Sequence, residues 1–295
     1  MPKRSALLIV NPISGKRSYP QVLPVIETEL KKAGWKFEIE IPDSENGTVN
    51  ASKESLKRGF DTVVACGGDG TVHDVLTGMD IENQSLGIIP LGSGNDLYRM
   101  LKIKKDIGIA IENLVNGENW KIDVGLVNNL RFLNTAGIGI DSETLLVRRD
   151  TEGFVKRNYV LLFLKTMGKL QPVSIKITAD GQVIDDTFMW AIVCNNNYIG
   201  GGMQIAPNAI LDDGLLDLIL IRKMSKPQML WNIPNIFSGK FVTHPKVSEM
   251  KVSSVRFETD TPKELGIDGD LRASTPVDFK VIPRVLSMIS MQASP

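Results

Sequence analysis

TVVACGGDGTVHDVL, residues 62–76, joins a short apolar run, a glycine-rich turn and a helical spacing of apolar side chains. The apolar run predicts a buried strand at 62–66, and Val72, Val75, Leu76 and Met79 predict a helix directly after the turn. A strand without a polar side belongs in a sheet that is covered on both faces, as in parallel α/β folds. We therefore expect an α/β domain around this stretch.

The alternation of strand and helix continues on both sides of this stretch. Apolar runs predict strands at 6–10, 37–41 and 86–91, and helical spacing predicts helices at 22–30 and 107–115. This alternation predicts a domain over residues 1–125, a parallel sheet with helices on both faces, and we expect residues 284–295 to pack back on it.

The pattern changes near residue 122, after which strands follow one another. Asn128-Asn129, Asp180-Gly181 and Asp268-Gly269 are typical of hairpin turns. Strands are predicted at 123–127, 132–136, 174–178, 186–195, 215–222, 249–258 and 277–283. Residues 126–283 are therefore predicted to form a mainly antiparallel β domain with a few inserted helices.

Composition excludes several classes of protein. The chain has 295 residues with 34 basic and 34 acidic side chains, whereas a bulk nucleic-acid binder is normally basic. Cys66 and Cys194 lie in apolar runs, which predicts buried reduced thiols, and no metal-type cysteine spacing is present. No apolar run is long enough to span a bilayer. We expect a cytoplasmic protein that reaches a membrane only from its surface.

Three glycine-rich turns follow three of the predicted N-terminal strands, at residues 11–16, 67–71 and 92–96. Ligands of open α/β sheets bind at the carboxyl ends of the strands, so the three turns are expected to surround one ligand. Glycine lets the backbone approach phosphates, and a helix N-terminus favours anions. Neither the Walker A spacing nor the Rossmann fingerprint is present, which indicates a different way of holding a nucleotide.

Asp69 stands in the second of these turns. A carboxylate in a phosphate-binding loop is repelled by phosphate unless a cation lies between them, which suggests Mg²⁺ on the nucleotide. The alternative is an aspartate that caps a turn. Thr71 and Asp74 also have a structural interpretation, as the N-cap and the N3 partner of a capping box.

The GGDGT segment at 67–71 resembles the signature of the diacylglycerol kinase catalytic-domain family, which includes sphingosine kinases and bacterial lipid kinases and is related to NAD kinases. Four further segments stand in the family's order over almost the whole chain: NPxSG at 11–15, PLGSGND at 90–96, AGIGID at 136–141, and GGGMxIAPxA at 200–209 followed by Asp213-Gly214. The resemblance implies a two-domain fold of the NAD kinase and diacylglycerol kinase type and an ATP- and Mg²⁺-dependent lipid kinase.

The resemblance also implies roles for individual residues. The ATP site implied by the family's three turns consists of Asn11, Pro12, Ile13, Ser14, Gly15, Gly67, Gly68, Asp69, Gly70, Thr71, Asp74, Ser93 and Asn95. Bacterial members hold a structural Mg²⁺, which implies Asp213 and the carbonyls of Leu216 and Leu218 as ligands. The family's catalytic base lies in a late Asp-Gly-Glu motif, and Asp270 takes that place here.

The chain departs from the family's pattern in two motifs. His73 and Asp74 replace the usual Asn-Glu after the second turn, which changes the geometry near the phosphates. Asp270 replaces glutamate and shortens the reach of the base by one methylene, and catalytic geometry is sensitive to about 1 Å. Taken without the resemblance, Asp268-Gly269-Asp270 is a hairpin turn and Asp213-Gly214 is a β-turn. Asp141 is either polar lining of the cleft or a satisfied loop residue.

The predicted mechanism is phosphoryl transfer in a cleft between the domains. The glycine turns hold ATP, Asp69 organises Mg²⁺, and Asp270 deprotonates the hydroxyl of a diacylglycerol-like or phosphatidylglycerol-like lipid. Two apolar segments with basic edges, 159–170 and 229–242, suit a membrane surface, although both could be helices that cover the β domain.

Other interpretations of the sequence remain open. They are a soluble-substrate kinase related to NAD kinase and a non-catalytic nucleotide-binding regulator. The acceptor lipid is open, including sphingoid bases, and so is a homodimer. His73 and His244 lie in no nucleophile motif, which argues against a Ser-His-Asp hydrolase.

Overall fold

The computed structural model describes residues 4–14, 19–44, 46–104, 106–151, 159–167 and 170–292. The chain divides into two compact units, residues 1–123 with 283–295 and residues 124–282. Strands β5 (Glu118–Val127) and β17 (Val277–Ser290) each continue from one unit into the other. Each unit has its own kind of sheet.

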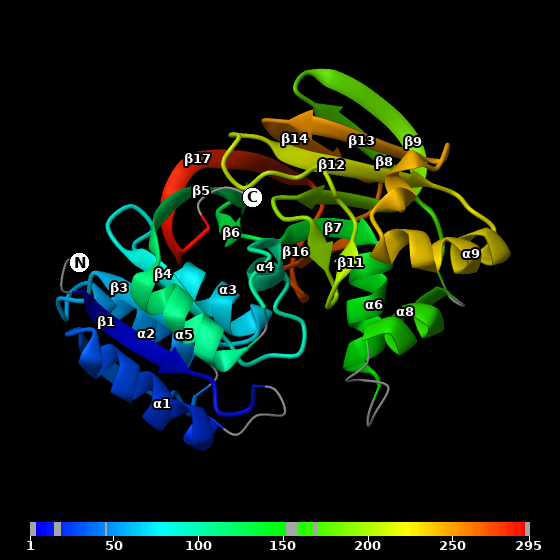
Figure 1. Cartoon of the computed structure of the whole chain (residues 1–295). Helices are drawn as coiled ribbons and strands as arrows, with labels where there is room; N and C mark the ends of the chain where they lie inside the picture. Colours follow the sequence, from blue (N-terminus) through cyan, green and yellow to red (C-terminus); the bar gives the residue numbers. More distant parts are fainter. Residues whose placement is uncertain are drawn as a thin grey trace. The chain divides into compact units, whose positions relative to one another are not determined.

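The first unit contains a parallel sheet in the order β4-β3-β1-β2, and the end of β17 runs parallel to β4. All residues of β3 and β4 are buried, as the continuous apolar runs predict. The α/β prediction for this part of the chain is confirmed (Figure 1). The strands are β1 (Ser5–Val10), β2 (Lys36–Glu40), β3 (Thr62–Gly67) and β4 (Ser85–Pro90).

Helices α1 and α5 pack together, and so do α2 and α3. Helix α2 was not predicted from the sequence, because it has few apolar residues and its position depends on α3. The Ser52 hydroxyl donates to the Val75 carbonyl (2.7 Å), and a Cβ at Gly78 would lie 2.2 Å from the Val49 carbonyl oxygen. The helices are α1 (Tyr19–Lys32), α2 (Gly47–Ser55), α3 (Asp69–Gly78), α4 (Asp96–Met100) and α5 (Ile107–Asn116).

The second unit is built from antiparallel strands around β9, which pairs with β7, β8 and β12. This confirms the predicted mainly antiparallel β domain. Its strands besides the ends of β5 and β17 are β6 (Leu130–Phe132), β7 (Thr135–Gly139), β8 (Val173–Ala179), β9 (Gln182–Cys194), β10 (Tyr198–Ile199), β11 (Met203–Gln204), β12 (Leu216–Arg222), β13 (Val247–Val252), β14 (Ser254–Glu258), β15 (Glu264–Ile267) and β16 (Asp270–Ser274).

Two predicted strands of this unit are each two shorter strands, so these predictions were wrong. The expected strand at 249–258 breaks at Ser253, because β13 pairs with β12 whereas β14 pairs with β8 and β17. The expected strand at 132–136 breaks at Leu133 and Asn134, whose backbone N–H groups donate to the Asp268 carboxylate instead of to a neighbouring strand.

Two hydrophobic clusters stabilise the second unit. One is made by side chains of several strands, including Phe188, Phe257 and Phe279. The other lies where helices cover β9 and β12, and Trp190 and Phe241 belong to it. The covering elements are α6 (Ile140–Arg149), α8 (Tyr159–Met167), α9 (Lys226–Phe237) and the short 3₁₀ helix η1 (Lys240–Thr243).

Two further predictions concern the cysteine thiols and the length of the helices. Cys66 and Cys194 are free and buried, as expected, and burial raises the pKa of Cys66 to about 12. Among the helices that the structure describes, none has the length and apolar character to cross a bilayer.

Candidate functional site

Adjacent parallel strands bring the three glycine turns together at one edge of the first unit. The Asn11 backbone N–H donates to the Cys66 carbonyl (3.1 Å), so the first turn lies against the end of β3. The Gly67 carbonyl accepts from Leu91 (2.9 Å) and Gly92 (3.2 Å), which fixes the third turn against the second. The turns therefore form one continuous surface at the carboxyl ends of β1, β3 and β4.

Thr71 joins the first turn to the second. Its buried hydroxyl accepts from the Asn11 amide (3.2 Å) and lies 3.5 Å from the Ser14 hydroxyl. Because α3 begins at Asp69 with Gly68 as its N-cap, Thr71 is not the N-cap of this helix, and the capping-box interpretation of Thr71 and Asp74 was wrong. Thr71 instead holds the predicted nucleotide loops in contact. Gly15 lies outside the described residues.

Asp69 joins the second turn to the third. Its two carboxylate oxygens accept from the backbone N–H groups of Asn95 (2.7 Å) and Asp96 (2.6 Å). These two hydrogen bonds explain why a carboxylate stands in this loop even without a cation. They correspond to the alternative in which the aspartate caps a turn. Mg²⁺ bound by Asp69 would have to share both oxygens with these donors. The role of Asp69 in metal binding stays a prediction.

Close backbone packing explains two of the glycines. A Cβ at Gly92 would lie 2.4 Å from the Gly68 Cα, so a side chain does not fit between the second and third turns. Asn95 follows with a left-handed backbone (φ 54°), and its side-chain amide donates to the Gly92 carbonyl (2.8 Å). Such an approach of two loop backbones requires glycine.

The solvent side of the three turns differs from the packed side. Pro12, Ile13, Gly70 and Ser93 are exposed, and no atom outside the loop lies within 4 Å of a Cβ placed on Gly70. The N-terminus of α3 begins beside Gly70, where backbone N–H groups and the helix dipole favour an anion. This arrangement suits the phosphates of a nucleotide.

Asp270 lies on a hairpin of the second unit. Asp268 (φ 47°) and Gly269 (φ 91°) form the turn between β15 and β16, and Asp270 is the first residue after it. The Asp268 carboxylate accepts from three backbone N–H groups, those of Leu133, Asn134 and Thr135, at 2.9–3.0 Å. Asp268 therefore fixes the hairpin, while the Asp270 carboxylate is exposed and pairs with Arg272 (3.0 Å).

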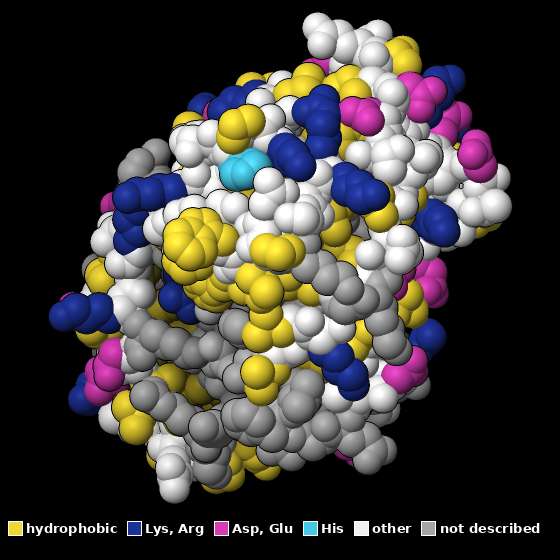
Figure 2. Space-filling view, turned by 90° about the vertical axis from the view of Figure 1, so that its right-hand side faces the viewer, with side chains coloured by type: hydrophobic (Ala, Val, Ile, Leu, Met, Phe, Trp, Pro, Cys, Tyr) yellow, Lys and Arg dark blue, Asp and Glu magenta, His cyan; other side chains and the backbone are white. Residues whose placement is uncertain are grey.

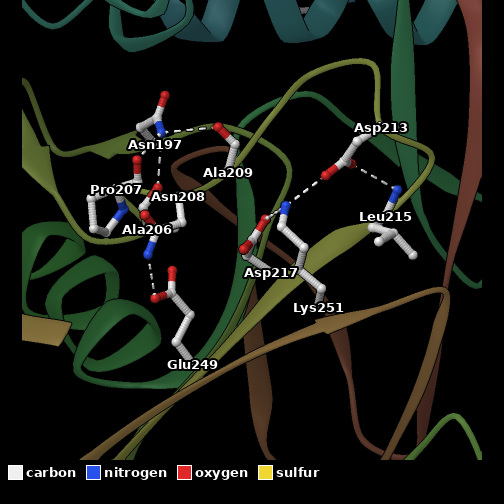
Figure 3. A network of polar contacts seen from close by, with 10 residues as sticks. All are labelled: Asn197, Ala206, Pro207, Asn208, Ala209, Asp213, Leu215, Asp217, Glu249 and Lys251. Atoms are coloured by element: carbon white, nitrogen blue, oxygen red, sulfur yellow. Dashed lines mark hydrogen bonds and ion pairs between the residues drawn. The ribbon is translucent and has the colours of Figure 1, made fainter. Parts of the chain in front are cut away.

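The carboxylate of Asp213 is bound by donors of the chain itself (Figure 3). One oxygen accepts from the Leu215 N–H (3.0 Å), and the other lies 2.6 Å from the Lys251 ammonium. The predicted carbonyl ligands Leu216 and Leu218 belong to β12, which is paired on both sides. A divalent cation at Asp213 would thus have to displace Lys251, and the donor set as it stands does not fit Mg²⁺.

Asp217 is a member of this network that sequence analysis missed. It is buried, lies opposite Lys251 on β13, and its carboxylate is 3.5 Å from the ammonium. Burial raises the pKa of Asp217 to about 6, although Lys251 opposes this shift. The signal in the sequence was a single carboxylate inside the apolar run 215–221. Among the described residues, no three His, Cys, Asp or Glu side chains are arranged to hold a metal ion.

Three other residues singled out from the sequence are packed against their own unit of the chain. Asp141 is buried beside Gly266 of β15, where a Cβ would lie 2.6 Å from its carboxylate. His73 is buried in α3, and His244 stacks on Phe241 and accepts from the Lys246 N–H (3.1 Å).

The chain matches two known protein families. Residues 5–127 match the diacylglycerol kinase catalytic domain, and residues 135–290 match the YegS C-terminal NAD kinase beta sandwich-like domain. Together these matches cover both halves of the chain in the predicted order.

Individual relatives agree with the family matches. A Staphylococcus haemolyticus protein named diacylglycerol kinase is 28% identical over 96% of this chain and 87% of its own length. A Bacillus subtilis protein of the same name is 28% identical over 97% and 96%, respectively. The crystal structure of a diacylglycerol kinase from Bacillus anthracis str. Sterne has a TM-score of 0.79 at 26% identity and covers 99% of both chains. Another structure from that organism gives 0.85 at 27% identity.

Proposed function

Because the chain belongs to the family that joins a diacylglycerol kinase catalytic domain to a YegS C-terminal NAD kinase beta sandwich-like domain, we propose that it is an ATP- and Mg²⁺-dependent lipid kinase. It transfers the γ-phosphate of ATP to a hydroxyl of a diacylglycerol-like or phosphatidylglycerol-like lipid. The observation that carries this proposal is the single surface formed by the three glycine turns.

ATP is proposed to bind with its phosphates over the exposed side of these turns. Pro12, Ile13, Gly70 and Ser93 are exposed there, whereas Thr71 and Asp69 hold the turns in place from behind. Bound Mg²⁺ would neutralise phosphate charge during transfer. The second turn contributes the N-terminus of α3 with its backbone N–H donors, and the exposed residues of all three turns leave room there for an anionic ligand.

Asp270 is proposed to accept the proton of the attacking hydroxyl. An exposed carboxylate on a rigid turn suits this role, because a base must reach the substrate and keep its orientation. Asp268 provides the rigidity through its three backbone bonds, and Arg272 limits the orientations of Asp270. The shorter side chain compared with glutamate requires the acceptor hydroxyl to come closer to the hairpin.

A soluble acceptor is the second candidate, because the C-terminal family match is described as NAD kinase beta sandwich-like. The apolar surroundings of α9 in the second unit favour the lipid. A pocket beneath α9 is lined only by apolar or aromatic side chains, which are Ile140, Trp190, Ile221, Met224, Met229, Ile236 and Phe241.

Transfer of labelled γ-phosphate from Mg-ATP tests the proposal. The acceptors are diacylglycerol, phosphatidylglycerol and a sphingoid base in mixed micelles, with NAD as the soluble control, and ATP binding is measured in parallel. Label in a lipid is the expected result. Label in NAD alone would establish the soluble-substrate kinase, and ATP binding without any labelled acceptor would indicate a nucleotide-binding regulator.

A further inference from the structure

Helix α9 is apolar on both of its sides. Met229 and Ile236 are buried against the hydrophobic cluster that covers β9 and β12. On its solvent-exposed side Leu230, Trp231 and Phe237 are 49%, 84% and 40% exposed. A helix that covers a soluble domain normally turns polar side chains outward, and a contiguous exposed apolar patch marks an interaction surface. The inner face of α9 belongs to the hydrophobic core, and its outer face has the apolar character of an interaction surface.

The segment of the chain that contains α9 carries charged side chains of one sign. Residues 218–248 contain five Lys or Arg and no Asp or Glu, which is five positive charges in 31 residues of a chain with zero net charge. Arg222 is neutralised by Asp186 (2.9 Å), whereas Lys223 and Lys240 are exposed. On the face that carries α9, hydrophobic side chains gather with Lys and Arg side chains around them (Figure 2). The surface therefore complements an apolar layer with an anionic border.

An anionic bilayer has both properties. Trp concentrates at the membrane–water interface, and Lys side chains on the rim of an apolar helix face contact anionic headgroups. Protein interfaces, in contrast, are depleted in Lys. The 12 residues of α9 span about 18 Å, which is shorter than the roughly 30 Å hydrocarbon core. The helix can therefore lie in the interface but cannot cross it.

We propose that the outer face of α9 docks the protein on anionic lipid membranes, with Leu230, Trp231 and Phe237 in the headgroup region and Lys223 and Lys240 on its rim. Docking would give the kinase access to a lipid acceptor, and this role of the docking rests on the proposed lipid kinase function. The docking itself is independent of ATP and of turnover, so it is measured separately.

Sedimentation with phosphatidylserine–phosphatidylcholine vesicles, without nucleotide, tests this surface. Trp231→Gln should weaken the partition coefficient at least about tenfold, because it removes the largest exposed apolar side chain. The matched control is Val183→Gln, which alters another exposed apolar residue (61%) of the same unit, at the start of β9, and should bind like the unchanged protein. Equal binding by both variants, or equal loss, overturns the proposal.

The charge of the rim is tested with a second variant. Lys223→Gln combined with Lys240→Gln should abolish the preference for phosphatidylserine over pure phosphatidylcholine vesicles, and an unchanged preference would contradict the proposed orientation. Analytical ultracentrifugation decides between a membrane and a second copy, because a dimer that Trp231→Gln dissociates would make the face a subunit interface. A protein that docks but phosphorylates no lipid would refute the lipid kinase proposal and leave the docking surface intact.

Discussion

Asp69 and Asp213 are both carboxylates in Asp-Gly turns, yet the two units hold them in different ways. In the first unit Asp69 accepts from two backbone N–H groups of a neighbouring turn. In the second unit Asp213 accepts from a backbone N–H nearby in sequence and from the ammonium of Lys251, a residue distant in sequence. The same dipeptide therefore serves a loop built from backbone in one unit and a charge network built from side chains in the other.

This difference decides which substitutions each unit tolerates. A loop that depends on backbone contact is sensitive to a Cβ added where two backbones touch, whereas a network of side chains is sensitive to lost charge. The catalytic proposal depends on both units, since the nucleotide turns lie in the first and Asp270 lies in the second. Substitutions can test each contribution separately.

The largest effect is expected at Asp270. Asp270→Asn keeps the size of the side chain and removes the proposed base, so kcat should fall by about 10²–10⁴-fold while ATP affinity and Tm stay unchanged. Asp260→Asn, which changes another exposed aspartate of the same unit, should keep full activity. Steady-state kinetics in mixed micelles measure both variants. Retained turnover in Asp270→Asn would refute the assignment of the base.

A pair of glycine substitutions tests the backbone-built loop. Gly92→Ala places a Cβ 2.4 Å from the Gly68 Cα and should lower the free energy of unfolding by about 1–3 kcal/mol. Gly70→Ala meets no atom of another segment within 4 Å and should leave Tm unchanged.

The same pair reports on ligand binding. If phosphates approach the exposed side of the second turn, Gly70→Ala should weaken ATP binding by about tenfold without loss of stability, because its methyl group occupies the space of the ligand. Isothermal titration calorimetry and thermal unfolding measure the two quantities. Unchanged ATP affinity in Gly70→Ala would show that the phosphates do not bind against this turn.

A smaller effect is expected at the charge network. Lys251→Met leaves Asp213 and the buried Asp217 without their cation and should destabilise the protein by about 2 kcal/mol, less than for a fully buried pair because Lys251 is partly exposed. Lys280→Met, an exposed lysine elsewhere in this unit, should have no comparable effect.

Addition of Mg²⁺ tests whether the Lys251 ammonium or a metal ion is the partner of Asp213. Without nucleotide, Mg²⁺ should raise the Tm of Lys251→Met and leave that of the unchanged protein as it is. Stabilisation of the unchanged protein by Mg²⁺, reversed by EDTA, would show that a divalent cation displaces Lys251 and binds at Asp213 as the family resemblance implies.

The sequence by itself determined the fold class, the family and the position of the glycine turns. These features depend on apolar runs, hairpin dipeptides and glycines, whose backbone preferences are local. The single strand expected at 249–258 and the missed helix α2 show the limit of such patterns. Ser253 marks a change of pairing partner, and α2 is fixed by its contacts with α3.

Only the tertiary structure decided which groups the candidate residues contact. It brought Thr71 to Asn11, Asp69 to the third turn and Lys251 to Asp213, and it divided α9 into a buried and an exposed face. These contacts depend on strand order, on register and on helix packing. Because such contacts join residues far apart in the chain, no local pattern of residues specifies them.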